Sequence, residues 1–236
     1  SSAASDVYKR QEEKSRSLNC RMRIVNHTDQ VIPMYWWSNM AVPEYPSGQI
    51  IVPAATAYTC KNWEVYKVNV PEVDGNNIFH YESIPDQIDY FFDIPYECPK
   101  YIANVNKDGY GLLQTSTRRL RARKLFSWGH NEGSDRWQHF LTEDAGPYIE
   151  IQAGLGKTQY GCLPMAPHTA WEWLEQYGPV HLPQTTSSQD NCQYIEQHVS
   201  SEELERLFQT SASFAHQKAA VVSSGLSLIH ISEPTR

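Results

Sequence analysis

The chain has 236 residues, with 27 acidic and 20 basic side chains and a formal net charge of -7 at pH 7. This balance argues against a nucleic-acid surface, because phosphate contacts need a basic electrostatic field. The mean hydropathy of -0.56 and the lack of any apolar run of about 18 residues argue against a membrane-spanning helix in this stretch of chain.

The two ends of the chain do not read as evolved protein. SSAASDVYKRQ (1–11) and LSLIHISEPTR (226–236) resemble in-frame translations of sequencing-adapter oligonucleotides. We set both aside from fold prediction, as one would an expression tag. The natural fragment is then expected to run from about Glu12 to Gly225 with both native termini missing. A signal peptide, lipid anchor or further domain could have been lost, so the sequence assigns no compartment.

The cysteines and histidines do not form metal-binding patterns. An odd number of cysteines without CxxC spacing is typical of neither a disulfide framework nor a zinc site, and it favours free thiols in a reducing compartment such as the cytoplasm. The histidines show no HExxH spacing. We therefore expect no metal and no cofactor. The cysteines are Cys20, Cys60, Cys98, Cys162 and Cys192.

Residues 12–183 contain short segments rich in β-branched and aromatic residues. Examples are RMRIVN, IIVPA, WEVYKVNV, YIANVN, YGLLQTS, YIEIQAG and TAWEWLE. Turn sequences separate them, such as NKDGYG (106–111) and NEGSD (131–135). Strands and turns in this pattern predict a mainly antiparallel β-sandwich or barrel.

The character of the chain changes after HLPQTTSSQDN (181–191), which is typical of a linker. Ser200 and Glu203 then form a capping box ahead of apolar residues at helical spacing. We predict a helix beginning near Ser201, within a linker and helical region over 184–225. One amphipathic helix cannot bury its own apolar stripe, so it either packs on the sandwich or begins a helical array.

Two aromatic clusters suggest a carbohydrate site. Adjacent tryptophans on a strand face opposite sides, so at least one of Trp36 and Trp37 is expected in the core. The other could stack on a pyranose ring, and amide and carboxylate side chains could bind the hydroxyls of that ring. The first cluster, PMYWWSNMAVPE (33–44), holds Trp36, Trp37, Asn39 and Glu44, and the second, FSWGHNEGSDRWQHF (126–140), holds Trp128, His130, Trp137 and Gln138.

The segment GPYIEIQAG (146–154) predicts a strand with two different faces. Side chains alternate along a strand, so Ile149 and Ile151 point one way while Tyr148, Glu150 and Gln152 point the other. The second face presents a carboxylate between a phenol and an amide, which makes it a candidate extension of the carbohydrate site.

The only basic run is TRRLRARK (117–124). As a strand it would divide its charges between two faces, with Arg119, Arg121 and Arg123 on one of them. One interpretation is a solvated edge strand that its charges protect from pairing. The alternative is functional: Arg119 would donate to an anionic or polyhydroxyl ligand.

Four segments together resemble a known family. They are VNHTDQVIPMYWWSN, NVNKDGYGLLQTSTRRLRARKLFSWG, RWQHFLTEDAGPYIEIQAGLGKTQY and TAWEWLEQYGP. They resemble a bacterial family of uncharacterised domains with a galactose-mutarotase-like β-supersandwich, commonly followed by tetratricopeptide repeats. The resemblance covers about residues 20–180. It implies an incomplete antiparallel supersandwich with a C-terminal helical segment, and a carbohydrate-active or carbohydrate-binding fold.

A more distant similarity concerns catalysis. GPYIEIQ is similar to the G-x-C-L-E-T-Q strand of aldose mutarotases, which implies that Glu150 is a catalytic base. Those enzymes supply a general-acid histidine from an N-x-T…P…N-H-x-Y-F segment, and the matching place here falls near Asn39. Ring opening needs an acid as well as a base, so His130 or Glu44 would have to substitute. The structural alternative is that Glu150 forms an ion pair with Arg119 or Arg121.

Three functions stay open from the sequence. The leading hypothesis is a carbohydrate-active protein that binds a saccharide on a concave sheet face, with Glu150 as base at an anomeric or glycosidic centre. The second is a non-catalytic carbohydrate-binding or scaffold module attached to a helical repeat array, and the third is an accessory domain of a larger glycosidase. A second ionisable group within reach of Glu150 would favour an enzyme. The sequence does not assign the sugar or the oligomeric state.

Overall fold

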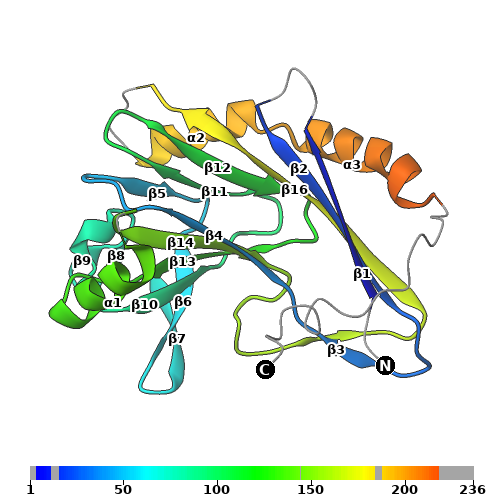
Figure 1. The fold of residues 1–236 in the computed structure, drawn as a ribbon, viewed down its shortest axis with the longest axis horizontal. Coiled ribbons are helices and arrows are strands. Elements are labelled where there is room, and N and C mark those ends of the chain that lie inside the picture. Colours follow the sequence, from blue (N-terminus) through cyan, green and yellow to red (C-terminus); the bar gives the residue numbers. More distant parts are fainter. Residues whose placement is uncertain (1–3, 12–15, 144, 184–187, 218–236) are drawn as a thin grey trace, which may run out of the picture.

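The computed structural model describes residues 4–11, 16–143, 145–183 and 188–217. Two six-stranded antiparallel sheets face each other, and helices cover one of them (Figure 1). Sheet 1 has the strand order β1 (Ala4–Gln11), β2 (Leu18–Asn26), β16 (Thr169–His181), β12 (Tyr110–Ser116), β11 (Lys100–Val105) and β5 (Gln49–Ile51). Sheet 2 has the order β4 (Trp37–Pro43), β14 (Tyr148–Gly154), β13 (Ala122–Ser127), β10 (Ile88–Phe92), β6 (Thr56–Lys61) and β7 (Glu64–Asn69).

Smaller elements complete the fold. Two short ladders pair β3 (Ile32–Met34) with β15 (Leu163–Met165) and β8 (Glu72–Val73) with β9 (Asn76–Asn77), and η1 is a 3-10 turn at Tyr81–Ser83. The helices are α1 (Glu132–Thr142), α2 (Ser188–His198) and α3 (Ser201–Ala215). None of the helices in the described ranges is long and apolar enough to span a membrane.

The inner faces of the two sheets bury the main hydrophobic core. Ile149 and Ile151 of β14 are fully buried there, packed with Leu125 of β13 and with Ile50 and Ile102 of sheet 1. The predicted alternation along β14 is confirmed. The mainly antiparallel sandwich predicted from the short β-rich segments is confirmed as well.

A polar network lies inside this core, and it corrects the interpretation of the basic run. Arg123 is fully buried on β13, which lies between β14 and β10 and is not an edge strand. Burial lowers the pKa of its guanidinium to about 10, and the nearby Glu175 carboxylate opposes that change. The charges in the sequence suggested exposure to solvent, whereas the two terminal nitrogens of the guanidinium are hydrogen-bonded inside the protein and Nε has no partner among the described residues. The acceptors are the carbonyl oxygens of Leu120, Ala122 and Lys100 and the hydroxyl of Ser116.

Glu175 of β16 is the matching buried acid, with no exposed surface. The Trp173 indole donates to its Oε1 at 3.0 Å, and the Ser38 hydroxyl donates to its Oε2 at 2.7 Å. Gln114 and Tyr177 donate to the same Oε2. Because each buried polar atom with a partner avoids a desolvation cost, these bonds allow a carboxylate inside the sandwich.

Helices α2 and α3 pack on the other face of sheet 1 (Figure 1). Ile195 of α2 and Leu204 of α3 share a buried cluster with Tyr101 and Leu174 of the sheet. The Ser200 hydroxyl accepts from the backbone N–H of Glu203 at 3.0 Å and caps α3, so the predicted start of this helix is confirmed. Of the two alternatives for the helix, packing on the sandwich is the observed one.

Three segments differ from the sequence predictions. The linker predicted over 181–191 is shorter, because α2 begins at Ser188. The turn predicted at 131–135 is the start of α1, which Asn131 caps by accepting from the Ser134 N–H at 3.0 Å. Ala4–Gln11, set aside as adapter-like, pairs with β2 as an edge strand. Backbone pairing at an open sheet edge needs no particular side chains, so the adapter origin of 1–11 stays a prediction.

Candidate functional site

The site begins with the strand register of sheet 2. Glu150 of β14 lies opposite Ala41 of β4 and Phe126 of β13, and Gln152 lies opposite Asn39 and Lys124. Residues directly opposite each other in antiparallel strands share a face. These side chains therefore lie together on the face of sheet 2 that points away from sheet 1, which we call the outer face.

Two amide side chains hold the Glu150 carboxylate. Asn39 Nδ2 donates to Glu150 Oε2 at 2.7 Å, and Gln152 Nε2 donates to the same oxygen at 2.8 Å. Within the described residues, Oε1 accepts no hydrogen bond and Glu150 forms no ion pair. The predicted alternative of a pair with Arg119 or Arg121 is not what these contacts show.

A chain of polar contacts leads from Glu150 across the outer face. Gln159 Nε2 donates to Gln152 Oε1 at 2.7 Å, and Lys124 Nζ donates to Gln159 Oε1 at 2.6 Å. Lys124 also forms an ion pair with Asp89 of β10 at 2.7 Å. This series of polar contacts therefore connects the Glu150 carboxylate to the buried Lys124 ammonium group through two amide side chains.

Aromatic rings flank this chain at both ends. At one end Trp128 makes edge contacts with Phe126 and Tyr148, with ring centroids 5.0 and 5.9 Å apart. At the other end Phe91 makes edge contacts with Trp37 and Tyr160, at 5.5 and 5.3 Å. Burial raises the pKa of the Tyr160 phenol to about 12, so this group stays protonated and can donate a hydrogen bond.

Gly154 is required for the position of Trp37. The two residues lie opposite each other in the β14–β4 ladder. A Cβ atom at Gly154 would lie 2.3 Å from Cε2 of the indole. The missing side chain lets the ring lie against the strand, which explains a glycine at the end of YIEIQAG.

His130 and Glu44 contact each other. His130 Nε2 lies 3.0 Å from Glu44 Oε1, and the Glu44 side chain is only 6% exposed. Burial raises the pKa of Glu44, while His130 lowers it. In the described part of the chain, neither residue forms a hydrogen bond or ion pair with Glu150. Glu44 follows Pro43 and is expected to point to the face opposite Asn39 and Ala41. The predicted replacement acids are thus not brought onto Glu150.

The other predicted residues lie at separate places. Trp36 packs edge-on against Trp173 in a hydrophobic cluster beside the main core, at 5.4 Å, as expected for one of two adjacent tryptophans. Trp137 lies on α1 and is 57% exposed. Gln138 is buried, and its Oε1 accepts from the Tyr148 N–H. Arg119 lies over the Trp171 ring of sheet 1 at 5.4 Å, in the turn before β13.

Sequence reasoning missed much of the outer face. Asp89 was detectable as a single acid in the apolar strand IDYFF, and Lys124 and Phe126 alternate with buried residues in ARKLFS. Gln159 and Tyr160 come from the loop after β14, where no periodicity exists to place them. The missed residues are Asp89, Phe91, Lys124, Phe126, Gln159 and Tyr160.

Residues 7–171 match the sequence model of one protein family, described as Domain of unknown function (DUF5107). The chain belongs to the DUF5107 family. The matched stretch includes β4, β13 and β14, and with them Asn39, Lys124 and Glu150. The outer face of sheet 2 is therefore part of the DUF5107 domain.

Solved structures share the fold of this DUF5107 domain. A TPR-domain containing protein from Parabacteroides distasonis is 24% identical, with a TM-score of 0.63 over 77% of this chain. The Slr1438 protein from Synechocystis is 12% identical with a TM-score of 0.53, and a candidate aldose 1-epimerase from Escherichia coli is 11% identical with a TM-score of 0.50, each over 76% of this chain.

This chain spans 31%, 55% and 66% of those three proteins, respectively. The fold is shared with the candidate aldose 1-epimerase, which confirms the predicted mutarotase-like fold.

Proposed function

We propose that the outer face of sheet 2 binds a saccharide. The observation that carries the proposal is the geometry of Glu150, whose Oε2 is fixed by Asn39 and Gln152 while no described residue donates to Oε1. A carboxylate oxygen of this kind can accept a sugar hydroxyl. Fixed amides and flanking aromatic rings complete the chemistry that carbohydrate sites use.

The fold supports the same proposal. One structural neighbour is named as a candidate aldose 1-epimerase, and another as a galactose mutarotase related enzyme. Those names describe the neighbours, and a shared fold alone does not transfer a reaction. The saccharide proposal for this chain depends on the Glu150 geometry, with the fold as supporting context.

A catalytic role for Glu150 is the more demanding form of the proposal. As a base it would take the proton of the anomeric hydroxyl while the bond from the anomeric carbon to the ring oxygen breaks, and an acid would protonate that oxygen. In the described part of the chain, the nearest cation connected to Glu150 by hydrogen bonds is Lys124, through Gln152 and Gln159. Among the described residues, no general acid forms a hydrogen bond with Glu150.

The alternative is a non-catalytic carbohydrate-binding or scaffold module beside a helical repeat array. Its supporting observation is the same lack of a directly contacting acid among the described neighbours of Glu150. A TPR-domain containing neighbour fits this arrangement. Binding without turnover would favour this alternative over an enzyme.

Saccharide titration tests the proposal. We expect tryptophan fluorescence to change on addition of at least one member of a panel of neutral and acidic sugars, because Trp37 and Trp128 flank the polar chain. Trp37→Leu should weaken that binding about tenfold, as loss of a stacking ring predicts. Trp137→Leu is the matched control, because Trp137 lies on the exposed side of α1. No binding by any sugar, or equal losses in both variants, would refute the proposed site.

A further inference from the structure

Three arginines in the turn between β12 and β13 line one cavity. Arg118, Arg119 and Arg121 line a space of about 460 Å³ together with Tyr96 and Trp171. Leu155, Leu163 and Pro164 form its apolar remainder. We call this cavity the arginine pocket. Its volume falls within the range of roughly 300–1,000 Å³ typical of small-molecule sites.

Two of the three guanidinium groups lie over aromatic rings. Arg119 lies over the Trp171 ring at 5.4 Å, and Arg118 lies over the Tyr96 ring at 5.7 Å. Across the described ranges, none of the three forms an ion pair or donates to a carboxylate. A guanidinium stacked on a ring keeps its N–H edge free for an oxyanion. In a chain of net charge -7, three arginines in one cavity are a local reversal of charge.

The pKa of a buried lysine beside the pocket is lowered by the same positive charges. Burial lowers the pKa of Lys100 to about 8, the Cys98 thiol opposes that change, and Arg123, Arg121 and Arg118 lower the pKa further. Lys100 Nζ donates to the carbonyl oxygen of Tyr96 at 3.2 Å. Arg118 and Arg121 are therefore close enough to Lys100 to lower its pKa.

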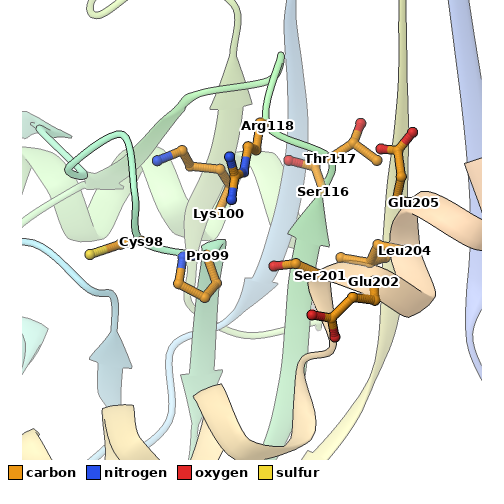
Figure 2. A pocket seen from close by; sticks show the side chains of 10 residues that line it. All are labelled: Cys98, Pro99, Lys100, Ser116, Thr117, Arg118, Ser201, Glu202, Leu204 and Glu205. Atoms are coloured by element: carbon orange, nitrogen blue, oxygen red, sulfur yellow. The ribbon is translucent and has the colours of Figure 1, made fainter.

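The acidic side chains of the closest helix lie at a second cavity, next to the arginine pocket. Figure 2 shows Lys100 and Arg118 together on one side of a space of about 500 Å³, with Glu202 and Glu205 of α3 on the other side. Glu202 accepts from the Ser200 hydroxyl, and Glu205 accepts from Gln209. Across the described residues, neither Glu202 nor Glu205 forms an ion pair with Arg118 or Lys100.

We propose that the arginine pocket is a second ligand site, for a small molecule that carries an oxyanion on a ring with an apolar face. The oxyanion, a sugar carboxylate or a phosphate ester, would accept paired N–H donors from Arg119 and Arg121. The ring would rest on Leu155, Leu163 and Pro164. This site is separate from the outer face of sheet 2 and does not depend on saccharide binding there.

Calorimetric titration of the whole chain tests the proposal with four probes: galacturonate, glucose 6-phosphate, inorganic phosphate and galactose. We expect at least one anionic probe to bind, more weakly as salt is raised, since charge attraction is screened. Arg119→Gln and Arg121→Gln should each weaken that binding by about 10-fold to 100-fold, which is the effect of losing a charged hydrogen bond. Arg136→Gln is the matched control, because Arg136 pairs with Glu132 on the exposed surface of α1.

The probes distinguish the sources of the oxyanion. Binding of galacturonate alone indicates a carboxylate ligand, and binding of glucose 6-phosphate with competition by inorganic phosphate indicates a phosphorylated one. Glu150→Gln should leave either affinity unchanged, which separates this site from the proposed saccharide face. The proposal is overturned if no anion binds, or if the affinity is the same in Arg119→Gln, Arg121→Gln and Arg136→Gln proteins of unchanged melting temperature.

Discussion

Lys124 and Asp89 form an ion pair across adjacent strands, with Nζ 2.7 Å from Oδ1 on the outer face of sheet 2. The lysine side chain is 5% exposed and the aspartate 29%. Lys124 also donates to Gln159 and ends the polar chain that begins at Glu150. This pair therefore supports both the sheet and the candidate site.

Lys124→Met should destabilise the domain. The change removes the cation and leaves the Asp89 carboxylate without its partner, which costs about 3 kcal/mol, at the lower end for a buried pair because Asp89 is partly exposed. Urea denaturation measures the free energy of unfolding. Adding Asp89→Asn should recover part of the loss, because no orphaned charge is then left. A double variant as unstable as the sum of the two single variants would contradict the pairing.

Glu150→Gln should separate function from architecture. The new amide can turn its oxygen toward Asn39 and Gln152 and keep both hydrogen bonds, so we expect the melting temperature of the parent. Sugar affinity should fall, and any anomerisation followed by polarimetry should slow by roughly 100-fold to 10,000-fold if Glu150 is the base.

Glu132→Gln provides the control for Glu150→Gln, since the Glu132 side chain is 90% exposed on α1. An unchanged reaction rate together with a sharply lowered melting temperature in Glu150→Gln would retire the catalytic role. Glu150 would then be a structural residue of β14.

Gly154→Ala should displace Trp37. Because the added methyl group would meet the indole at 2.3 Å, either the ring or the β14 backbone must move, at a cost of about 1–3 kcal/mol for overpacking. Near-ultraviolet circular dichroism and sugar titration measure the displacement. Gly161→Ala is the matched control, since no heavy atom lies within 4 Å of the Cβ position there. Equal behaviour of the two variants would count against the packing described.

Acid should loosen helix α3 from sheet 1. Burial raises the pKa of Glu172, but hydrogen bonds from His216 and Arg21 outweigh it, so the pKa lies below its ordinary value of 4.5. A group with a lowered folded-state pKa stabilises the fold above its unfolded pKa, and that contribution is lost as pH falls through the folded value. The hydrogen-exchange protection of α3, relative to the intrinsic exchange rate at each pH, should therefore fall below about pH 4.5.

Glu172→Gln provides the comparison for this pH dependence. The variant should be less stable than the parent at pH 7, and its α3 should show a smaller change between pH 7 and pH 3. An identical acid response in both proteins would exclude Glu172 as the titrating group.

The sequence predicted the elements whose signals are local. Alternation placed Ile149 in the core and Glu150 on the opposite face, and the Ser200 capping box marked the start of α3. Helix α1 escaped prediction because its first turn, EGSD, contains Gly133 and Ser134, which favour turns as much as helix. The burial of Arg123 depends in part on the Lys100 carbonyl of β11 and the Ser116 hydroxyl of β12, which no local pattern reveals.

The site was predictable only in part for the same reason. Tyr148, Glu150 and Gln152 lie on one strand, so their common face follows from period-2 alternation alone. The pairing of Lys124 with Asp89 joins two strands that are separated in sequence, and its geometry depends on the β10–β13 register. Gln159 is positioned by a loop. Such relationships arise from tertiary packing.

Neighbouring side chains of strand β16 pack in different parts of the fold. Trp171 lines the arginine pocket and Trp173 packs between the sheets, while Glu172 and Leu174 meet the helices on the opposite face. One residue inserted between Trp171 and Leu174 would move the side chains of all following strand residues to the opposite face of the sheet. The length of the strand is therefore constrained at once by the arginine pocket, the sandwich interior and the helical layer.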